Sequence, residues 1–158
     1  MGQPISAASL ARGVIDANQY LVLGTADAAG QPWTTPVYFA HEGYREYFWV
    51  SAPERTHSQN LVVRPAVAVV IFDSQAGINT GQGVYMAAVA KQVDDADVAR
   101  GIELFSARCL THGGRAFSVA EVTGHADLRL YHALATQHWI LAKDGGPDRR
   151  TLVDINAP

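Results

Sequence analysis

Three short apolar segments follow one another closely in the first third of the chain, and their spacing constrains the fold more than any other feature. The first, Tyr20–Ala26, is apolar and partly β-branched, and the turn Asp-Ala-Ala-Gly at 27–30 follows it, with glycine where a positive φ is wanted. Residues 33–40 and 44–51 form two more predicted strands around the turn at 41–43. Such short connections permit hairpins but leave no room for the crossover helix of a parallel βαβ unit. The segment is therefore predicted to be an antiparallel meander.

The rest of the chain alternates between helical and strand patterns. Apolar residues at helical spacing predict helices over residues 4–18, 54–63 and 95–110. Further strands are predicted where the pattern is continuously apolar or alternating, over residues 67–73, 84–93, 125–131 and 136–142.

These elements predict a mostly β fold, a six- to seven-stranded antiparallel barrel with a few helices, because closure removes the exposed edges of a sheet. A length of 158 residues fits a single domain over residues 1–158. Within it we place an N-terminal helix, a barrel core, a second helix and C-terminal strands, at residues 4–18, 19–93, 95–110 and 122–155.

Composition and charge exclude several classes of protein. The net charge is −3 and no block of Lys and Arg stands out, which argues against a nucleic-acid partner. No apolar run is long enough to span a membrane, and no signal peptide opens the sequence. Cys109 is the only cysteine, so neither an intrachain disulfide nor a paired-cysteine metal site is expected. These features predict a cytoplasmic protein with no membrane partner.

The most informative chemical signal lies where the predicted strand 44–51 gives way to the helix 54–63. Arg55, Thr56, His57 and Ser58 stand at the start of that helix. Free backbone N–H groups and the helix dipole favour an anion there, and arginine and hydroxyl side chains can add hydrogen bonds. A simple helix cap beside a solvated arginine explains the same residues, so this stretch alone leaves a phosphate site and a cap open.

An ordered set of motifs resembles the flavin-binding split barrels of the pyridoxamine 5′-phosphate oxidase family. The set spans residues 18–93 and consists of Thr-Pro-Val-Tyr-Phe at 35–39, Phe48-Trp49, Arg-Thr-His-Ser-Gln-Asn-Leu at 55–61 and Arg-Pro-Ala-Val-Ala-Val at 64–69. A weaker similarity occurs at Trp139. The resemblance favours the phosphate site over the plain cap.

The resemblance implies an FMN site. Backbone groups of residues 35–38 would face the isoalloxazine edge and the ribityl chain, and residues 55–58 would hold the phosphate. The cofactor-binding residues implied within one chain are Thr35, Pro36, Val37, Tyr38, Trp49, Val50, Arg55, Thr56, His57 and Ser58.

Gly81-Gln82-Gly83 is similar to the family segment whose glutamine reaches a flavin from the neighbouring subunit. Gln82 carries both a donor and an acceptor, which suits the pyrimidine edge of a flavin. A loop glutamine beside a bulge is the alternative. The resemblance thus implies a homodimer with the cofactor at the interface.

Two features depart from the family pattern. Relatives commonly have lysine near the position of His57, and a neutral imidazole is a poorer counter-charge, although a bound phosphate would favour the imidazolium. Trp139, with Lys143 and the arginines at 149–150, could cover the cofactor, but it does not reproduce the C-terminal segment of pyridoxamine phosphate oxidases proper. Trp139 stays a candidate cofactor contact, with an interface or core position preferred, and pyridoxamine phosphate oxidation is not predicted.

The expected function is an FMN-binding oxidoreductase with two-electron chemistry at the flavin and an unknown substrate. No side chain is nominated as a catalytic acid or base, the 6 histidines form no metal signature, and no Gly-x-Ser-x-Gly elbow indicates a hydrolase. One alternative is a reductase that uses the deazaflavin coenzyme F420, although its polyanionic tail would want more lysines than Lys91 and Lys143. The others are a non-catalytic flavin or haem carrier, sensor or stress protein, and a dimeric barrel with an eroded site.

Overall fold

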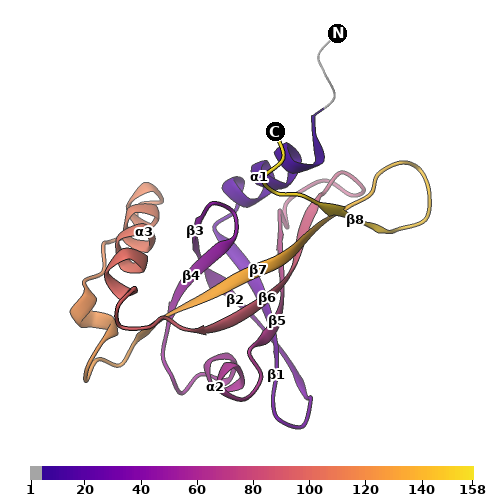
Figure 1. The fold of residues 1–158 in the computed structure, drawn as a ribbon. Helices are drawn as coiled ribbons and strands as arrows, with labels where there is room; N and C mark the ends of the chain where they lie inside the picture. The colour runs from indigo at the N-terminus through magenta and orange to yellow at the C-terminus, as the bar shows by residue number, and fades with distance from the viewer. Residues whose placement is uncertain (1–4) are drawn as a thin grey trace.

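The computed structural model describes residues 5–158 and consists of strands, three α-helices and one short 3₁₀ helix (Figure 1). The strands are β1 (Tyr20–Ala26), β2 (Pro32–Tyr38), β3 (Ala40–Glu42), β4 (Glu46–Ser51), β5 (Ala66–Phe72), β6 (Gly83–Gln92), β7 (Arg129–Leu141) and β8 (Arg150–Val153). The helices are α1 (Ala7–Ala17), α2 (Thr56–Val63) and α3 (Val98–Thr111), and the 3₁₀ helix covers Val119–Val122.

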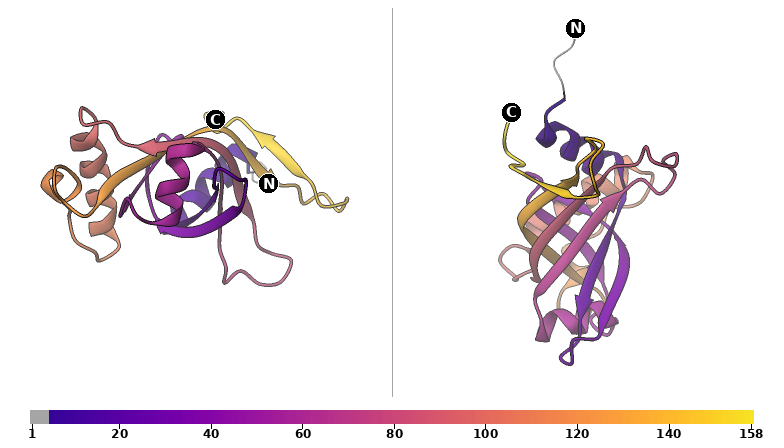
Figure 2. Two further views of the ribbon diagram at one scale, coloured as in Figure 1. Left: turned by 90° about the horizontal axis from the view of Figure 1, so that it is seen from below. Right: turned by 90° about the vertical axis from the view of Figure 1, so that its right-hand side faces the viewer.

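The strands form one 8-stranded sheet in the order β2-β1-β5-β6-β7-β4-β3, with β8 paired to β7. Every pairing is antiparallel. The sheet curls into a split barrel. The strands at the two ends of the strand order are β2 and β3. Helices α1 and α2 lie across opposite ends of this barrel (Figure 2). The mostly β, antiparallel split barrel expected from the sequence is confirmed, with 8 strands where six to seven were expected.

Alternation along the strands fills the barrel interior. On β4, Tyr47 and Trp49 point into the core, while Phe48 packs in a second cluster on the outer side. This division follows from the two-residue period of a strand. The interior core includes Leu21, Leu23, Tyr47, Trp49, Ile71, Val84, Met86 and Tyr131.

Helix α3 packs against the outer face of β4 and β7 and supplies the second apolar cluster, which joins Phe48 and Leu130 to Ile102 and Phe105. Gly101 allows this close approach, because a Cβ at that position would lie 2.6 Å from Leu130 Cδ2. The helix therefore stands beside the barrel at a fixed distance, and its C-terminal half faces β2.

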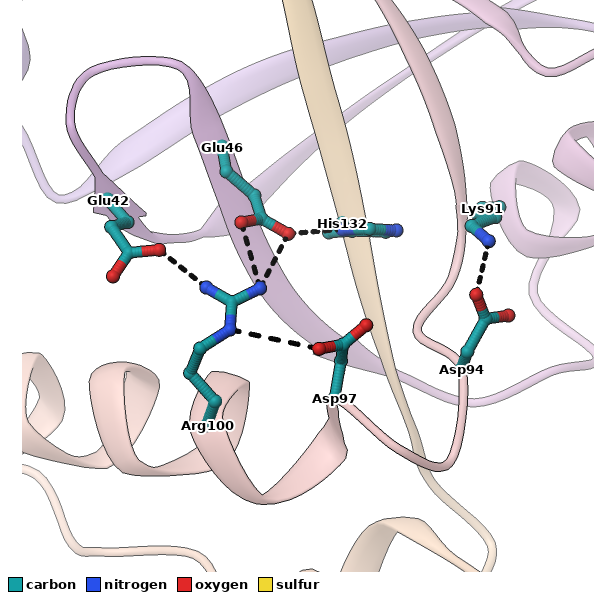
Figure 3. Close-up of polar contacts among 7 residues, drawn as sticks. All are labelled: Glu42, Glu46, Lys91, Asp94, Asp97, Arg100 and His132. Atoms are coloured by element: carbon teal, nitrogen blue, oxygen red, sulfur yellow. Dashed lines mark hydrogen bonds and ion pairs between the residues drawn. The ribbon is translucent and has the colours of Figure 1, made fainter.

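A polar network also ties α3 to the sheet (Figure 3). Arg100 binds Glu42 on β3 and donates to Glu46 Oε2 on β4 at 3.0 Å. Glu46 Oε1 in turn lies 2.6 Å from His132 Nδ1 on β7. One arginine of the helix thus connects three strands.

The predicted division of the C-terminal region was wrong. Residues 125–131 and 136–142 were expected to be two strands, but β7 is one strand of 13 residues that begins at Arg129. The register shifts so that Ala87 pairs with Gln137 and Ala88 with Ala135, which leaves Thr136 as the extra residue of a bulge. The bulge reverses the alternation partway along β7, and one strand therefore reads as two in the sequence. Within the predicted C-terminal strands 122–155, the other strand observed is β8.

The turn predicted at 41–43 is displaced toward the C-terminus. β3 extends to Glu42, and Gly43 and Tyr44 form the turn with φ of 57° each. Two consecutive positive φ angles are typical of a tight hairpin. The N-terminal helix predicted over 4–18 is observed as α1, with Ser6 capping Ser9 N at 3.1 Å, and residue 4 lies outside the described residues.

Candidate functional site

A cavity of about 510 Å³ lies where the barrel is split. β2 forms one wall, and the end of β4 with the start of α2 forms another. Helix α3 contributes Phe105 at the side. The residues lining it are Trp33, Thr35, Pro36, Val37, Tyr38, Val50, Ser51, Arg55, Thr56, His57 and Phe105.

Eight of the residues predicted from the sequence meet in this cavity: Thr35, Pro36, Val37, Tyr38, Val50, Arg55, Thr56 and His57. They come from three elements that the chain folds together. β2 ends the strand order and carries two prolines, Pro32 and Pro36, which are tolerated at the edge of a sheet. An edge strand presents backbone N–H and C=O groups to a neighbouring molecule, which suits the backbone contacts expected of residues 35–38.

The polar end of the cavity is the first turn of α2. Arg55 occupies the N-cap position, and no side chain among residues 5–158 caps this helix. The amides of a first helical turn have no partner within the helix, and the helix dipole is positive there. Arg55 and Thr56 line the same end. This end of the cavity can therefore receive one anionic group.

His57 does not add a positive charge to this end. Its side chain is 6% exposed, and its Nε2 lies 2.9 Å from Ser51 Oγ. Burial, followed by the nearby Arg55 charge, lowers the pKa of His57 below its usual value. The imidazole is thus neutral at pH 7 and joins β4 to α2 through Ser51.

Two of the predicted site residues are buried behind the cavity rather than lining it. Trp49 is 0% exposed and stacks on Tyr131 inside the barrel, with ring centroids 6.0 Å apart. Ser58 is 2% exposed, and its hydroxyl has no hydrogen-bond partner among residues 5–158. The cofactor contact expected of Trp49 is absent from this cavity, because the strand alternation points its ring inward while Val50 lines the site.

Gln82 and Trp139 lie elsewhere on the barrel. Gln82 Nε2 donates to the Leu141 carbonyl at 2.9 Å, and its Oε1 accepts from the amides of Gly83 and Leu141, each at 2.9 Å. Both lone pairs of this oxygen are thus engaged within the chain. Trp139 lines a second cavity of about 560 Å³ on the outer face of the sheet, together with Tyr85 and Arg150.

Three lining residues were not predicted from the sequence: Trp33, Ser51 and Phe105. Trp33 is 49% exposed and donates from Nε1 to Thr35 Oγ1 at 2.9 Å. The two-residue period of β2 could have revealed it, since it shares a face with Thr35 and Val37. Phe105 comes from a distant helix, and no local pattern indicates its place in the site.

Tyr38 carries a polar contact at the side of the cavity near α3. Its hydroxyl lies 2.8 Å from Nδ1 of His112, the C-cap residue of α3. Burial first, and then the neighbouring Cys109, raise the pKa of Tyr38 above its usual value. The hydroxyl therefore keeps its proton at neutral pH.

Two other features bear on function. Within residues 5–158, acidic, histidine and cysteine side chains form no group of three or more placed to hold a metal ion. None of the helices in the described part of the chain combines the length and the apolar character that crossing a membrane requires.

Comparison with known proteins places the sequence in one family. Residues 9–138 match the family model described as pyridoxamine 5′-phosphate oxidase. A search of curated protein sequences finds no match to this chain.

Solved structures share the fold at low sequence identity. A heme binding protein from Mycobacterium smegmatis is similar with a TM-score of 0.71 and 19% identity, over 96% of this chain and 60% of that one. The chain therefore spans less than two thirds of that protein. The heme storage protein HutZ from Vibrio cholerae has a TM-score of 0.63 and 20% identity, covering 80% of this chain and 87% of its own. An F420 reductase has a TM-score of 0.56 and 17% identity, covering 76% and 88%.

Proposed function

This chain belongs to the pyridoxamine 5′-phosphate oxidase family, and from that membership we propose that it is an FMN-binding oxidoreductase. The observation that carries the proposal is the cavity at the split. Its polar end offers Arg55 and the uncapped start of α2, and its walls offer the flat side chains of Trp33 and Phe105. A phosphate would match the polar end of the cavity, and a planar ring system would match its walls.

The residues present fit FMN in charge as well as in shape. Arg55, Thr56 and the first amides of α2 would hold the phosphate. The edge of β2 over residues 35–38, with Val50, would face the ring and the ribityl chain. When bound, FMN supplies two-electron transfer, while the protein binds it, orients a substrate and limits access of water.

The proposal includes a homodimer with the cofactor at the interface. The outer sheet face formed by β5, β6 and β7 exposes apolar side chains, among them Ala66, Ala68, Phe72, Val89 and Leu134. An antiparallel sheet usually has one solvated, polar face, so an apolar outer face indicates an interaction surface. Trp139 of each subunit would then serve the cofactor bound by the other, and Gln82 would contribute only its second Nε2–H, because its other polar contacts are made within its own chain.

Coenzyme F420 is the alternative cofactor for an enzyme of this kind. Arg55 is the only charged residue among those lining the cavity. One arginine suits one phosphate better than the polyanionic tail of the deazaflavin coenzyme. The structural similarity to an F420 reductase is the observation that favours this alternative cofactor.

A non-catalytic haem or flavin carrier is the second candidate function. It is supported by the similarity to the heme binding protein from Mycobacterium smegmatis and to HutZ. Either function suits a reducing compartment such as the cytoplasm, in keeping with the buried free thiol of Cys109.

Titration of the purified protein with FMN, coenzyme F420 and haem, followed by absorbance and by FMN fluorescence, tests the proposal. We expect FMN to bind, and Arg55→Ala to raise the Kd about ten- to a hundredfold, because a charge-assisted contact is worth about 1.5–3 kcal/mol. Arg115→Ala is the matched control, since Arg115 pairs with Glu121 on the surface. Binding of haem alone would favour the carrier, and uptake of none of the three would overturn the proposal.

A further inference from the structure

We propose that Tyr38 and His112 form a proton relay that delivers a proton to a substrate bound at the cofactor in the split cavity. The inference rests on the proposed function and adds to it the acid that the sequence did not identify. It assigns Tyr38 Oη as the proton donor and His112 as the group that returns the proton from solvent.

The geometry of Tyr38 suits this role. Tyr38 is the last residue of β2 and lines the cavity, and its hydroxyl lies 2.8 Å from His112 Nδ1. Its ring is held edge-on between Tyr20 and Phe105, with centroids 5.9 and 5.6 Å away. A side chain held by packing on both sides keeps its hydroxyl in one place.

His112 gives this hydroxyl a hydrogen-bond partner at the surface of the protein. It is exposed and caps the C-terminal end of α3. An exposed imidazole can take up a proton from solvent and pass it to a hydrogen-bonded partner. The path therefore runs from water through the imidazole and the phenol to the cavity, with no gap in hydrogen bonding between the two side chains.

The proton balance of the step is simple. A two-electron acceptor such as a quinone or a carbonyl would take up a proton together with the hydride that reduced FMN would supply. Tyr38 Oη gives up that proton, and His112 Nδ1–H as imidazolium reprotonates the phenolate oxygen. Neutral His112 then recovers its proton from water. Cys109 and Arg108 on α3 and Tyr20 on β1 also face Tyr38.

A measurement without any cofactor tests the coupling. The ring ¹⁵N shifts of His112 are followed by NMR against pH in the wild type, Tyr38→Phe and Tyr20→Phe. We expect Tyr38→Phe to change the tautomer balance and the titration midpoint of His112, with Tyr20→Phe leaving both unchanged. The exposed His125 is the internal reference in every spectrum. A His112 titration unaffected by Tyr38→Phe would overturn the relay.

A second measurement tests proton delivery. The FMN-loaded dimer is reduced and mixed with menadione, and flavin absorbance gives the rate of reoxidation in H₂O and D₂O. We expect Tyr38→Phe to slow this step at least about tenfold and abolish its solvent isotope effect, because a positioned acid contributes about 10²–10⁴-fold. We expect His112→Asn to remove the histidine-like limb of the pH profile.

The outcomes separate the two proposals. Equal rates and pH profiles in the wild type and Tyr38→Phe, with FMN bound to both at similar Kd, would overturn the relay and leave the proposed function standing. A wild-type protein that does not bind FMN would overturn the proposed function and the relay with it.

Discussion

His57 determines the electrostatic character of the candidate site through one hydrogen bond. Its ring nitrogen contacts Ser51 Oγ at 2.9 Å in a buried position, so it joins the end of β4 to the first turn of α2. Arg55 is then the charged side chain that remains for an anion at this end of the cavity. The site therefore has one fixed positive charge, and its affinity for a phosphate depends on that residue and on the helix amides.

Ser51→Ala is expected to destabilise the fold by about 1–3 kcal/mol, because it leaves His57 Nε2 buried without a partner. Urea unfolding followed by circular dichroism measures this loss. Ser74→Ala is the control, since Ser74 lies in an exposed loop and its replacement should change the free energy of unfolding by no more than about 0.5 kcal/mol. Equal stabilities of the two variants would show that the Ser51–His57 contact contributes nothing.

The site residues could be predicted from the sequence where a motif fixes the backbone, and not where the side-chain direction matters. Arg55, Thr56 and His57 follow directly from the start of α2, and the structure brings them together in the cavity. Trp49 does not line this cavity, and a resemblance transfers positions along a strand without testing which face they occupy. The alternation of Phe48, Trp49 and Val50 contains that information, since only alternate positions share a face.

Helix α3 depends on the absence of a side chain at Gly101. The added Cβ of an alanine would lie 2.6 Å from Leu130 Cδ2 and 3.0 Å from Phe48 Cε1. Leu130 and Phe48 are fully buried, so neither has room to yield. Because α3 carries Phe105 at the cavity and His112 beside Tyr38, its distance from the sheet also fixes the site.

Gly101→Ala is expected to cost up to about 2 kcal/mol, since overpacking of about 1–3 kcal/mol is offset by a gain of about 1 kcal/mol in helix propensity. Gly13→Ala in α1 is the matched control. An added Cβ there meets nothing within 4 Å in the described part of the chain, so this variant should gain up to about 1 kcal/mol. Thermal unfolding of both variants measures the difference, and a stabilised Gly101→Ala would contradict the tight packing of α3.

Element boundaries were predictable where the residue pattern keeps one period. β1 is observed at Tyr20–Ala26, as its apolar run predicts, and the turn after it has Gly30 at φ 87°. β7 was misread because the bulge at Thr136 changes the phase of alternation. A bulge depends on the register of the neighbouring strand β6, and one strand alone does not reveal it.

The whole molecule assembles its candidate site from segments that are far apart in sequence. Trp33 on β2, Arg55 before α2 and Phe105 on α3 line one cavity because the split of the barrel brings these elements together. Composition and motif order predicted the barrel, but the contribution of α3 depends on how that helix packs across β4 and β7. Long-range packing of this kind leaves no periodic signal in the sequence.

Stability of the whole fold is expected to fall as pH drops below about 6.5, the ordinary pKa of histidine. Burial is the first cause that lowers the pKa values of His41, His57 and His138 in the folded state. As the pH falls, the unfolded chain therefore takes up protons before the folded protein does. The contribution of these histidines to stability is complete above about pH 6.5 and is lost as the pH falls toward their lowered folded-state pKa values. Urea unfolding between about pH 7.5 and 5.5 measures the slope.

His138→Gln provides the matched test of this slope, because a glutamine amide can still donate to the Tyr44 carbonyl that His138 Nε2 contacts at 2.8 Å. We expect a shallower pH dependence in this variant. His125→Gln, at an exposed position, should leave the slope unchanged. If stability were flat over this range in the wild type, the pKa values of the buried histidines would have to be the same in the folded and unfolded states.

In the proposed homodimer, the outer sheet face would connect the oligomeric state to cofactor binding. Ala68 lies exposed on β5 and faces outward between Gly24 on β1 and Ala87 on β6. Ala68→Arg is expected to abolish the dimer in sedimentation analysis, because it places a charge in the centre of an apolar interface. It should also lower FMN affinity, since part of each site would come from the other subunit.

Gln31→Arg, in the exposed turn between β1 and β2, is the control for the added charge. A variant that stays dimeric would show that the two copies meet elsewhere, and a monomer that binds FMN as tightly as the wild type would show that one chain holds the complete site.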